Sequence, residues 1–303
     1  MLFILIFLSL FSFNSFSSEN FSDHEAYCLN NKEKSCLKLL NKRIYLEKQY
    51  SKFWFKLMTY KLDYYYDNQK FEKIIELSPE LINIKNKPEV FEVQLNFYYS
   101  KALSYFGKTE QAKYFANKTI QNLENIYNLF EEPIRMVEIA NMEYVFGDKE
   151  RAYKLLLLAE NKFGEQVEPI FHFELNTNKG HILSQWKSYE RASLMYQKAL
   201  SAVRYTKHDK KKIIAYYNFA RSNQYIEKNN IAIEYYKQAE MLLYKNSNPR
   251  MLALTLYRIA QIYKLENDLD NLAEYLKKVN VKYLYEGYHS DYHQLSKLVT
   301  HKR

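Results

Sequence analysis

One helical pattern recurs along this chain at intervals of forty residues. In the segment YERASLMYQKAL, Ala192, Tyr196 and Ala199 are separated by four and three residues, which places them on one face of a helix. The same spacing returns in four further segments: EQAKYFANKT, ERAYKLLLLAE, NIAIEYYKQAE and DNLAEYLKK. A regular period of this length predicts a chain built from stacked copies of one structural unit.

A small residue lies twelve positions before each copy of the pattern. These residues are Ser100, Ala140, Gly180, Ala220 and Ala260. Small side chains at matched positions predict two helices per unit, packed too closely for larger side chains. Gly107 and Gly147 are also forty residues apart, and each is expected to end a first helix in the left-handed conformation.

The composition favours a chain that is nearly all helix. It holds only 5 Gly and 5 Pro, against 30 Tyr and 19 Phe. So few turn-forming residues leave little room for tight hairpins or glycine-rich phosphate loops. The fold class expected from composition is therefore all-α.

At this point the sequence resembles the tetratricopeptide repeat (TPR) family. In KGHILSQWKSYERASLMYQKAL, Gly180, Tyr189, Ala192, Tyr196 and Ala199 match the small and large positions of that repeat. The resemblance implies a right-handed superhelical solenoid of antiparallel helix pairs. We expect a degenerate pair over residues 44–92, five repeats over 93–280 and a capping helix over 281–303.

Two features depart from the standard TPR pattern. The period is forty residues rather than about 34, so the second helix of each pair is expected to be longer. This longer unit resembles TPR-like arrays of bacterial signalling proteins. Several expected core positions hold polar side chains: Asn176, Lys179, Glu143 and Asn223.

The TPR resemblance also implies a concave groove lined by the first helices. The residue after each small position should point into it, and we call this set the inner-face ladder: Lys101, Asn141, His181, Arg221 and Gln261. Aromatic residues four positions away share the same helix face: Tyr105, Tyr217, Tyr225 and Tyr257. The resemblance implies binding of an extended peptide or protein segment, and Lys101 and Arg221 favour an acidic one. The alternative is that these polar side chains only solvate the groove.

The first residues indicate export. An apolar run from Met1 to about Phe13 is too short for a membrane span of about 20 residues and suits a signal peptide, assigned to residues 1–17. No basic residue precedes the run, so an uncleaved anchor is the alternative. No later segment could span a bilayer, so we expect a periplasmic or secreted protein.

The two cysteines lie in the expected N-terminal cap, residues 18–43. Cys28 and Cys36 could pair only if the chain turns between them, because eight residues of continuous helix would hold them about 12 Å apart. A disulfide suits an exported protein, and two free thiols are the alternative.

Other classes of function find little support in the residues. The formal net charge is +9, yet Lys and Glu alternate along the helices, so nucleic acid is not an expected partner. No motif of a catalytic site is present, and no cofactor is expected. His289, Asp291 and His293 form only a weak metal pattern, and we expect no metal there. The sequence predicts a non-enzymatic exported scaffold; the alternative is a sensor module that signals through a separate membrane kinase or cyclase.

Overall fold

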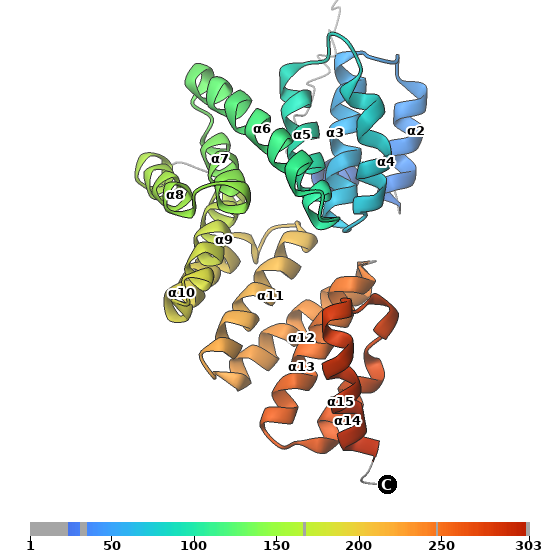
Figure 1. The fold of residues 1–303 in the computed structure, drawn as a ribbon, viewed down its shortest axis with the longest axis vertical. Helices are drawn as coiled ribbons and strands as arrows, with labels where there is room; N and C mark the ends of the chain where they lie inside the picture. Colours follow the sequence, from blue (N-terminus) through green and yellow to red (C-terminus); the bar gives the residue numbers. More distant parts are fainter. Residues whose placement is uncertain (1–23, 31–34, 166–167, 247, 301–303) are drawn as a thin grey trace, which may run out of the picture.

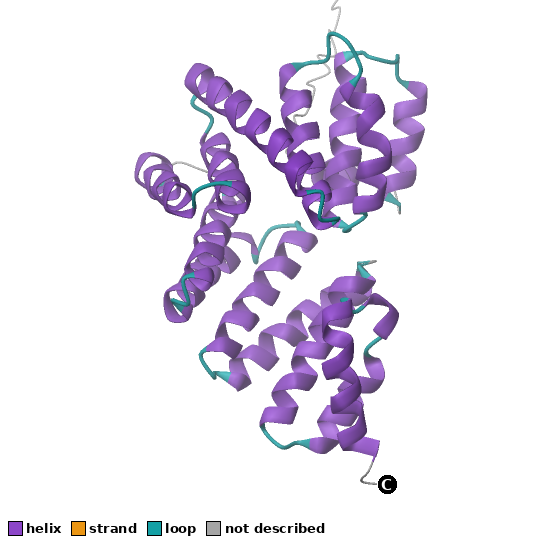
Figure 2. Cartoon of the chain, viewed as in Figure 1, coloured by secondary structure: helices purple, strands orange, loops and turns teal. Residues whose placement is uncertain are grey.

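The computed structural model describes residues 24–30, 35–165, 168–246 and 248–300. Within them the chain is helical, with no β-strand, and short loops join the helices (Figure 2). This confirms the all-α solenoid. No helix of the described residues is long and apolar enough to cross a membrane. The expected signal peptide, residues 1–17, lies outside the described residues.

Five antiparallel helix pairs follow the forty-residue period (Figure 1). The pairs are α5 (Glu89–Tyr105) with α6 (Thr109–Phe130), α7 (Pro133–Phe146) with α8 (Lys149–Phe163), α9 (Pro169–Gln185) with α10 (Tyr189–Val203), α11 (Asp209–Tyr225) with α12 (Asn229–Lys245), and α13 (Pro249–Leu265) with α14 (Leu269–Lys278). An earlier pair, α3 (Lys52–Asp67) with α4 (Phe71–Ile82), lies within the range expected for the degenerate unit.

The small residues lie where the paired helices touch. Ser100, Ala140, Ala220 and Ala260 have no exposed surface, and Gly180 is buried as well. A Cβ added to Gly180 would lie 2.5 Å from a ring carbon of Tyr196, so only glycine fits there. The close packing expected from the sequence is confirmed.

The turn between paired helices was predicted only in part. Gly107 has the expected left-handed backbone, with φ of 71°, but Gly147 has φ of −127°. The left-handed conformation recurs instead at non-glycine residues forty positions apart: Lys187, Glu227 and Asn267. Gly147 serves another purpose, because the carboxylate of Glu143 folds over it and accepts a hydrogen bond from the Asp148 N–H at 3.1 Å.

The extra length of the unit is shared between both helices. Only α6, with 22 residues, is clearly longer than its partner; α8 and α10 have 15 residues each, while α5, α9 and α11 have 17. In most pairs, therefore, the second helix is not the longer of the two. A longer first helix lengthens the whole unit. It also buries more surface against both neighbouring pairs.

Polar residues at core positions are buried and bonded locally. Arg151 donates to the Glu143 carboxylate at 2.6 Å, and Lys179 donates to the Glu160 carboxylate at 2.7 Å. The side-chain amides of Asn223 and Asn176 donate to the backbone carbonyls of Phe219 and His172, each at 2.8 Å. Each hydrogen bond offsets the cost of removing the polar group from water. The repeat therefore tolerates these substitutions without losing its register.

A disulfide-bonded cap covers the N-terminal end. Helices α1 (His24–Asn30) and α2 (Cys36–Leu46) are joined by the Cys28–Cys36 disulfide, with Cα atoms 5.3 Å apart. The two cysteines lie on two separate helices and not on one continuous helix, as a bridge requires. The Tyr27 ring stacks on Tyr60 of α3 at 5.2 Å, which packs the cap against the solenoid.

The C-terminal cap begins later than expected. Two short 3-10 turns, Val281–Tyr283 and Glu286–Tyr288, precede α15 (His289–Thr300). Leu284 and Leu295 are buried in one apolar cluster with residues of α13 and α14. This segment covers the last apolar face, which has no further repeat to pack against it.

The solenoid follows a curved path that brings its two ends toward each other. In Figure 1 the N-terminal helices α2 to α5 and the C-terminal helices α12 to α15 lie on one side, joined through α6 to α10 on the other. The start of α11 lies near the end of α3. This curvature decides which part of the inner face is open.

Candidate functional site

The N-terminal half of the inner-face ladder is linked by its own hydrogen bonds. The Lys101 ammonium donates to the Asn141 side-chain oxygen at 2.5 Å, across one full repeat. Asn141 in turn donates to the side-chain oxygen of Asn178 on α9. Lys101 also lies 3.9 Å from the centre of the Phe97 ring. These residues are aligned as expected, but their polar groups already have partners.

Lys101 lies in an enclosed environment. Burial lowers its pKa to about 8, although Glu174 and Glu138 act in the opposite direction. Gln94 donates to Glu138 at 3.0 Å, and Lys211 of α11 pairs with Glu174 at 3.2 Å. Charged side chains from α5, α7, α9 and α11 therefore fill this half of the concave face.

His181 is turned toward its own helix pair. Its Nδ1 lies 2.9 Å from the Tyr196 hydroxyl, and its ring stacks on Tyr144 with centroids 6.2 Å apart. Burial, with a contribution from Lys101, lowers the pKa of His181 to about 4. The imidazole is therefore neutral near neutral pH and already bonded, which makes it a structural contact more than a binding group.

Arg221 of the ladder is half-buried and lies beside the exposed ring of Tyr225. The Arg221 guanidinium lies 4.0 Å from the Tyr225 ring centre and donates to Gln224 at 2.7 Å and to the Tyr225 hydroxyl at 2.8 Å. The Tyr225 ring stacks on Tyr189 at 4.6 Å and remains 45% exposed. Stacking orients this cation and ring while leaving both within reach of a ligand.

The C-terminal end of the ladder is covered by α15. Gln261 donates to the Tyr257 hydroxyl at 3.0 Å and to Asp291 of α15 at 3.2 Å. Tyr257 has no exposed surface, so its expected place in an open groove is wrong. Helical spacing identified the correct face of α13, but it could not reveal that α15 folds back across it. Asp291, which belongs to the weak metal pattern of the sequence, accepts the hydrogen bond from Gln261.

Tyr105 and Tyr217 lie beside the region where the two halves meet. Tyr105 is 44% exposed, and its hydroxyl accepts from Arg250 of α13 at 3.4 Å. Tyr217 is half-buried, and burial raises the pKa of its hydroxyl. The structure therefore keeps Tyr105, Tyr217, Arg221 and Tyr225 as candidate groove residues.

Contacts between remote segments close the curved solenoid. Arg250 donates to the Gln69 carbonyl at 3.3 Å and pairs with Glu72 at 3.4 Å. The Tyr285 hydroxyl donates to the Gln69 side-chain oxygen at 3.2 Å, over a separation of 216 residues. A cavity of about 180 Å³ lies here, lined by residues of α3, α4, α11 and α13. No sequence signal of the repeat pointed to this closure.

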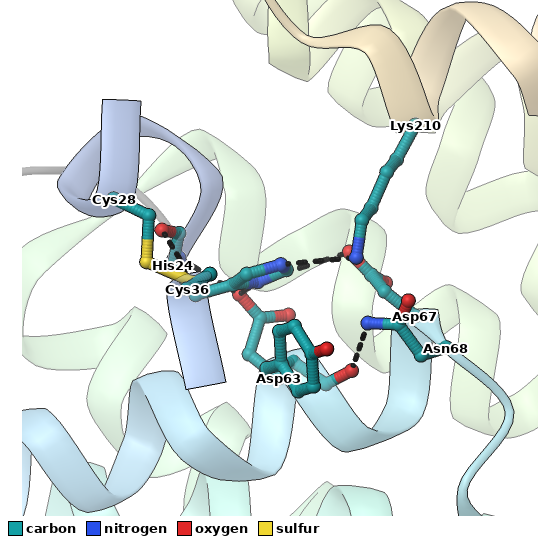
Figure 3. Close-up of a disulfide and its surroundings, with 8 residues drawn as sticks. His24, Cys28, Cys36, Asp63, Asp67, Asn68 and Lys210 are labelled. Carbon is teal, nitrogen blue, oxygen red and sulfur yellow. Dashed lines mark hydrogen bonds and ion pairs between the residues drawn. A yellow bond between two sulfur atoms is a disulfide. The ribbon is translucent and has the colours of Figure 1, made fainter. Parts of the chain in front are cut away.

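A buried charge cluster forms the other part of the closure (Figure 3). His24 Nδ1 lies 2.8 Å from the Asp63 carboxylate and 3.8 Å from that of Asp67. The Lys210 ammonium of α11 lies 3.4 Å from His24 Nε2. The Tyr98 hydroxyl donates to Asp63 at 2.9 Å. The cluster joins α1, α3, α5 and α11.

The two carboxylates and the one imidazole of this cluster are groups that could hold a metal ion. One atom from each of His24, Asp63 and Asp67 lies within 4.8 Å of the others. Lys210 already supplies a cation beside them, and Lys211 acts electrostatically on both carboxylates. Because these lysines balance the carboxylate charges, the chemistry favours an ion-pair cluster over a metal centre.

The pKa values within the cluster diverge. Burial opposes ionisation of Asp63, but His24 outweighs it and holds the pKa of Asp63 well below its usual range. Burial, together with the Asp63 charge, raises the pKa of Asp67 to about 6. Burial acts to lower the pKa of His24, but Asp63 and Asp67 outweigh it, so that pKa is raised. Asp67 is thus the member of the cluster whose ionised form is unfavourable at neutral pH.

We therefore predict that Asp67→Asn stabilises the protein at neutral pH but not in acid. The folded protein binds the Asp67 proton more tightly than the unfolded chain does. The contribution of protonated Asp67 to the free energy of unfolding is therefore lost as pH rises from about 4 to about 6. The substitution should raise the free energy of unfolding by about 1 to 2 kcal/mol at neutral pH and change it little near pH 4. Urea unfolding at both pH values measures this, and an equal effect at both would contradict it.

A further hollow, away from the ladder, measures about 520 Å³ and is lined by residues of α8, α9 and α10, including Glu160, His172 and Asn176. None of the ladder residues lines it.

Comparison with known proteins places the fold. No family profile and no curated protein sequence matches the chain. Among solved structures, a Rap protein complexed with Competence and Sporulation Factor is similar with a TM-score of 0.56 and 11% identity, over 82% of this chain and 70% of that one. The chain has a TPR-like fold.

Two further structures agree with this assignment of the TPR-like fold. Cut9-Hcn1, described as an APC/C hetero-tetramer, matches with a TM-score of 0.52 and 14% identity, over 87% of this chain and 52% of that one. BtubC from P. vanneervenii matches with a TM-score of 0.50 and 14% identity, over 70% of this chain and 87% of that one. At these identities the likeness concerns the fold alone.

Proposed function

We propose that this TPR-like protein is an exported, non-enzymatic scaffold that binds a peptide or protein segment on its concave face. Folds of this kind typically serve as interaction scaffolds. The observation that carries the proposal is the pre-oriented pair on α11 formed by the half-buried Arg221 and the exposed ring of Tyr225. The N-terminal half of the ladder is filled by its own contacts, so the binding region is the part around α11.

The chemistry of this region favours an acidic segment or a free carboxylate. Arg221 offers a planar guanidinium, which can donate two parallel hydrogen bonds to a carboxylate. Tyr105, Tyr217 and Tyr225 supply aromatic surface for apolar side chains of the same ligand. Such a combination favours a peptide that carries both carboxylate groups and apolar side chains.

Export is the second element of the proposal, with the periplasm or the extracellular medium as the compartment. The Cys28–Cys36 disulfide supports it, because such bonds persist mainly in oxidising compartments. The apolar run at the N-terminus supports it as well. The alternative, a sensor module acting through a separate membrane kinase or cyclase, would use the same groove to receive its signal.

Charge reversal at Arg221 tests the groove. A random peptide display library selects ligands, and the affinity of an enriched peptide is measured by fluorescence anisotropy. Arg221→Glu should weaken binding at least about tenfold, because charged hydrogen bonds contribute about 1.5 to 3 kcal/mol each. Arg204→Glu is the matched control, since Arg204 is exposed and outside the ladder.

The control should bind within about twofold of the parent protein, because screened charges outside the groove contribute little. Equal loss in both variants would indicate a non-specific charge effect and would remove the groove assignment. Enrichment of basic peptides would leave the groove in place but contradict the acidic ligand.

A further inference from the structure

An exposed group of apolar and cationic side chains projects from the connection between α2 and α3. We call residues 42–53 the α2–α3 corner. Its exposed apolar side chains are Tyr45, Leu46, Tyr50 and Phe53, with exposed fractions of 87%, 66%, 52% and 44%. Water-exposed apolar side chains this close together in sequence are unfavourable unless something covers them.

Cationic side chains surround these apolar groups. Lys42, Arg43, Lys48 and Lys52 are all exposed, and Glu47 is the one acidic residue in this range. The Glu47 carboxylate is half-buried and accepts a hydrogen bond from Ser51 at 2.7 Å. The corner therefore combines a net positive charge with protruding apolar tips.

The corner is held rigidly by the helices beneath it. The Tyr50 ring lies 5.4 Å from that of Trp54 and 6.4 Å from that of Phe55, and Phe55 contacts Phe91 of α5 at 4.8 Å. Trp54, Phe55 and Phe91 are buried. This support orients the Tyr50 ring in advance, which reduces the ordering cost of covering that part of the corner.

From this geometry we infer that the α2–α3 corner docks onto the surface of an anionic lipid bilayer. Tyrosine and leucine side chains insert at the headgroup boundary, where amphipathic rings are favoured, while the flanking lysines and arginine pair with lipid phosphates. A protein interface is a poorer match, because lysine is depleted from protein interfaces.

Docking in this way leaves the concave face free. The corner extends only to the second residue of α3, whereas Asp67 and the closure with Lys210 lie at the last turn of that sixteen-residue helix. In Figure 1 the α2–α3 connection lies at the top of the N-terminal helices, away from α11. A protein bound through this corner could hold a ligand at Arg221 while attached to a membrane. The inference does not depend on the proposed groove.

A site-specific contact assay tests the inference on the full chain. Leu46→Trp and Tyr205→Trp are compared by fluorescence quenching with brominated lipids, using vesicles of phosphatidylcholine with an equal part of phosphatidylglycerol. Tyr205 is 89% exposed and lies between α10 and α11, outside the corner. The tryptophan at 46 should be quenched and that at 205 should not. If the protein were attached through the apolar N-terminal run alone, the tryptophan at 46 would be quenched no more than that at 205. This result would overturn the inference.

Affinity for the same vesicles provides the second test. Tyr45→Ser with Leu46→Ser should weaken binding about tenfold or more, whereas the control pair Tyr205→Ser with Tyr244→Ser should not. Lys48→Glu with Lys52→Glu should weaken binding at least about fivefold for each charge and abolish the preference over pure phosphatidylcholine. Unchanged binding in both corner variants would overturn the inference. So would self-association that the Tyr45 and Leu46 substitutions abolish in sedimentation velocity, because the corner would then be a protein interface.

Discussion

Asp63→Ala should lower the free energy of unfolding by about 3 to 5 kcal/mol. The Asp63 carboxylate accepts from the His24 N–H at 3.1 Å, contacts His24 Nδ1 at 2.8 Å and accepts from the Tyr98 hydroxyl at 2.9 Å. His24 and Tyr98 are both buried, so losing Asp63 removes the acceptor of the Tyr98 hydroxyl and leaves His24 Nδ1 with the more distant Asp67 carboxylate at 3.8 Å. Chemical denaturation at neutral pH measures the loss.

Two control variants separate charge from shape. Asp63→Asn retains an acceptor oxygen and should cost clearly less than the alanine substitution. Asp270→Ala removes an exposed aspartate from the first turn of α14 and should cost about 0.5 kcal/mol.

Hydrogen exchange gives a local readout of the same change. In Asp63→Ala the amides of α1 should exchange faster, because its anchor on α3 is lost, while those of α14 should not change. A loss below about 1 kcal/mol, with α1 still protected, would show that the cluster does not hold the cap.

Gly180→Val should destabilise the protein by about 2 to 3 kcal/mol. Even the first added carbon would lie 2.5 Å from one Tyr196 ring carbon and 2.8 Å from two others. Tyr196 cannot easily move, because it is buried and its hydroxyl is bonded to His181. The paired helices α9 and α10 must separate, which disrupts the core of the central repeat.

The sign of the glycine effect is itself informative. At an open helix position, replacing glycine by alanine stabilises by about 1 kcal/mol, so a loss in Gly180→Ala would already reveal the close contact. Gly287→Val is the matched control, since an added Cβ there meets nothing within 4 Å. Thermal unfolding of both variants provides the comparison. A Gly180→Val protein as stable as the parent would show that α9 and α10 are not in contact at this point.

The repeat was predictable because its signals are local. Periodic small residues such as Ala140 and Ala220 report which helix face must pack closely, and a forty-residue spacing reports that the same packing recurs. The structure confirms the burial of these residues and the alignment of Lys101 with Asn141 across one repeat. The cysteine pair was foreseen as one of two alternatives, because short-range geometry allowed a bridge only with a turn.

The state of the inner face could not be predicted in the same way. His181 and Tyr257 occupy ladder and groove positions by spacing, yet one is bonded to Tyr196 and the other is covered by α15. The number of residues between two helix positions says which face they share. It does not say whether another segment lies on that face.

The sequence by itself determined the helix pairs, their register and the close contacts between them, because each depends on residues near one another in the chain. Only the tertiary structure decided that the solenoid curves until Lys210 reaches α3 and Arg250 reaches α4, closing one half of the concave face. That curvature is the sum of small rotations between successive pairs, each set by side-chain packing at an interface. No single segment carries it, so only the folded chain shows that the Tyr225 ring stays exposed beside a half-buried Arg221.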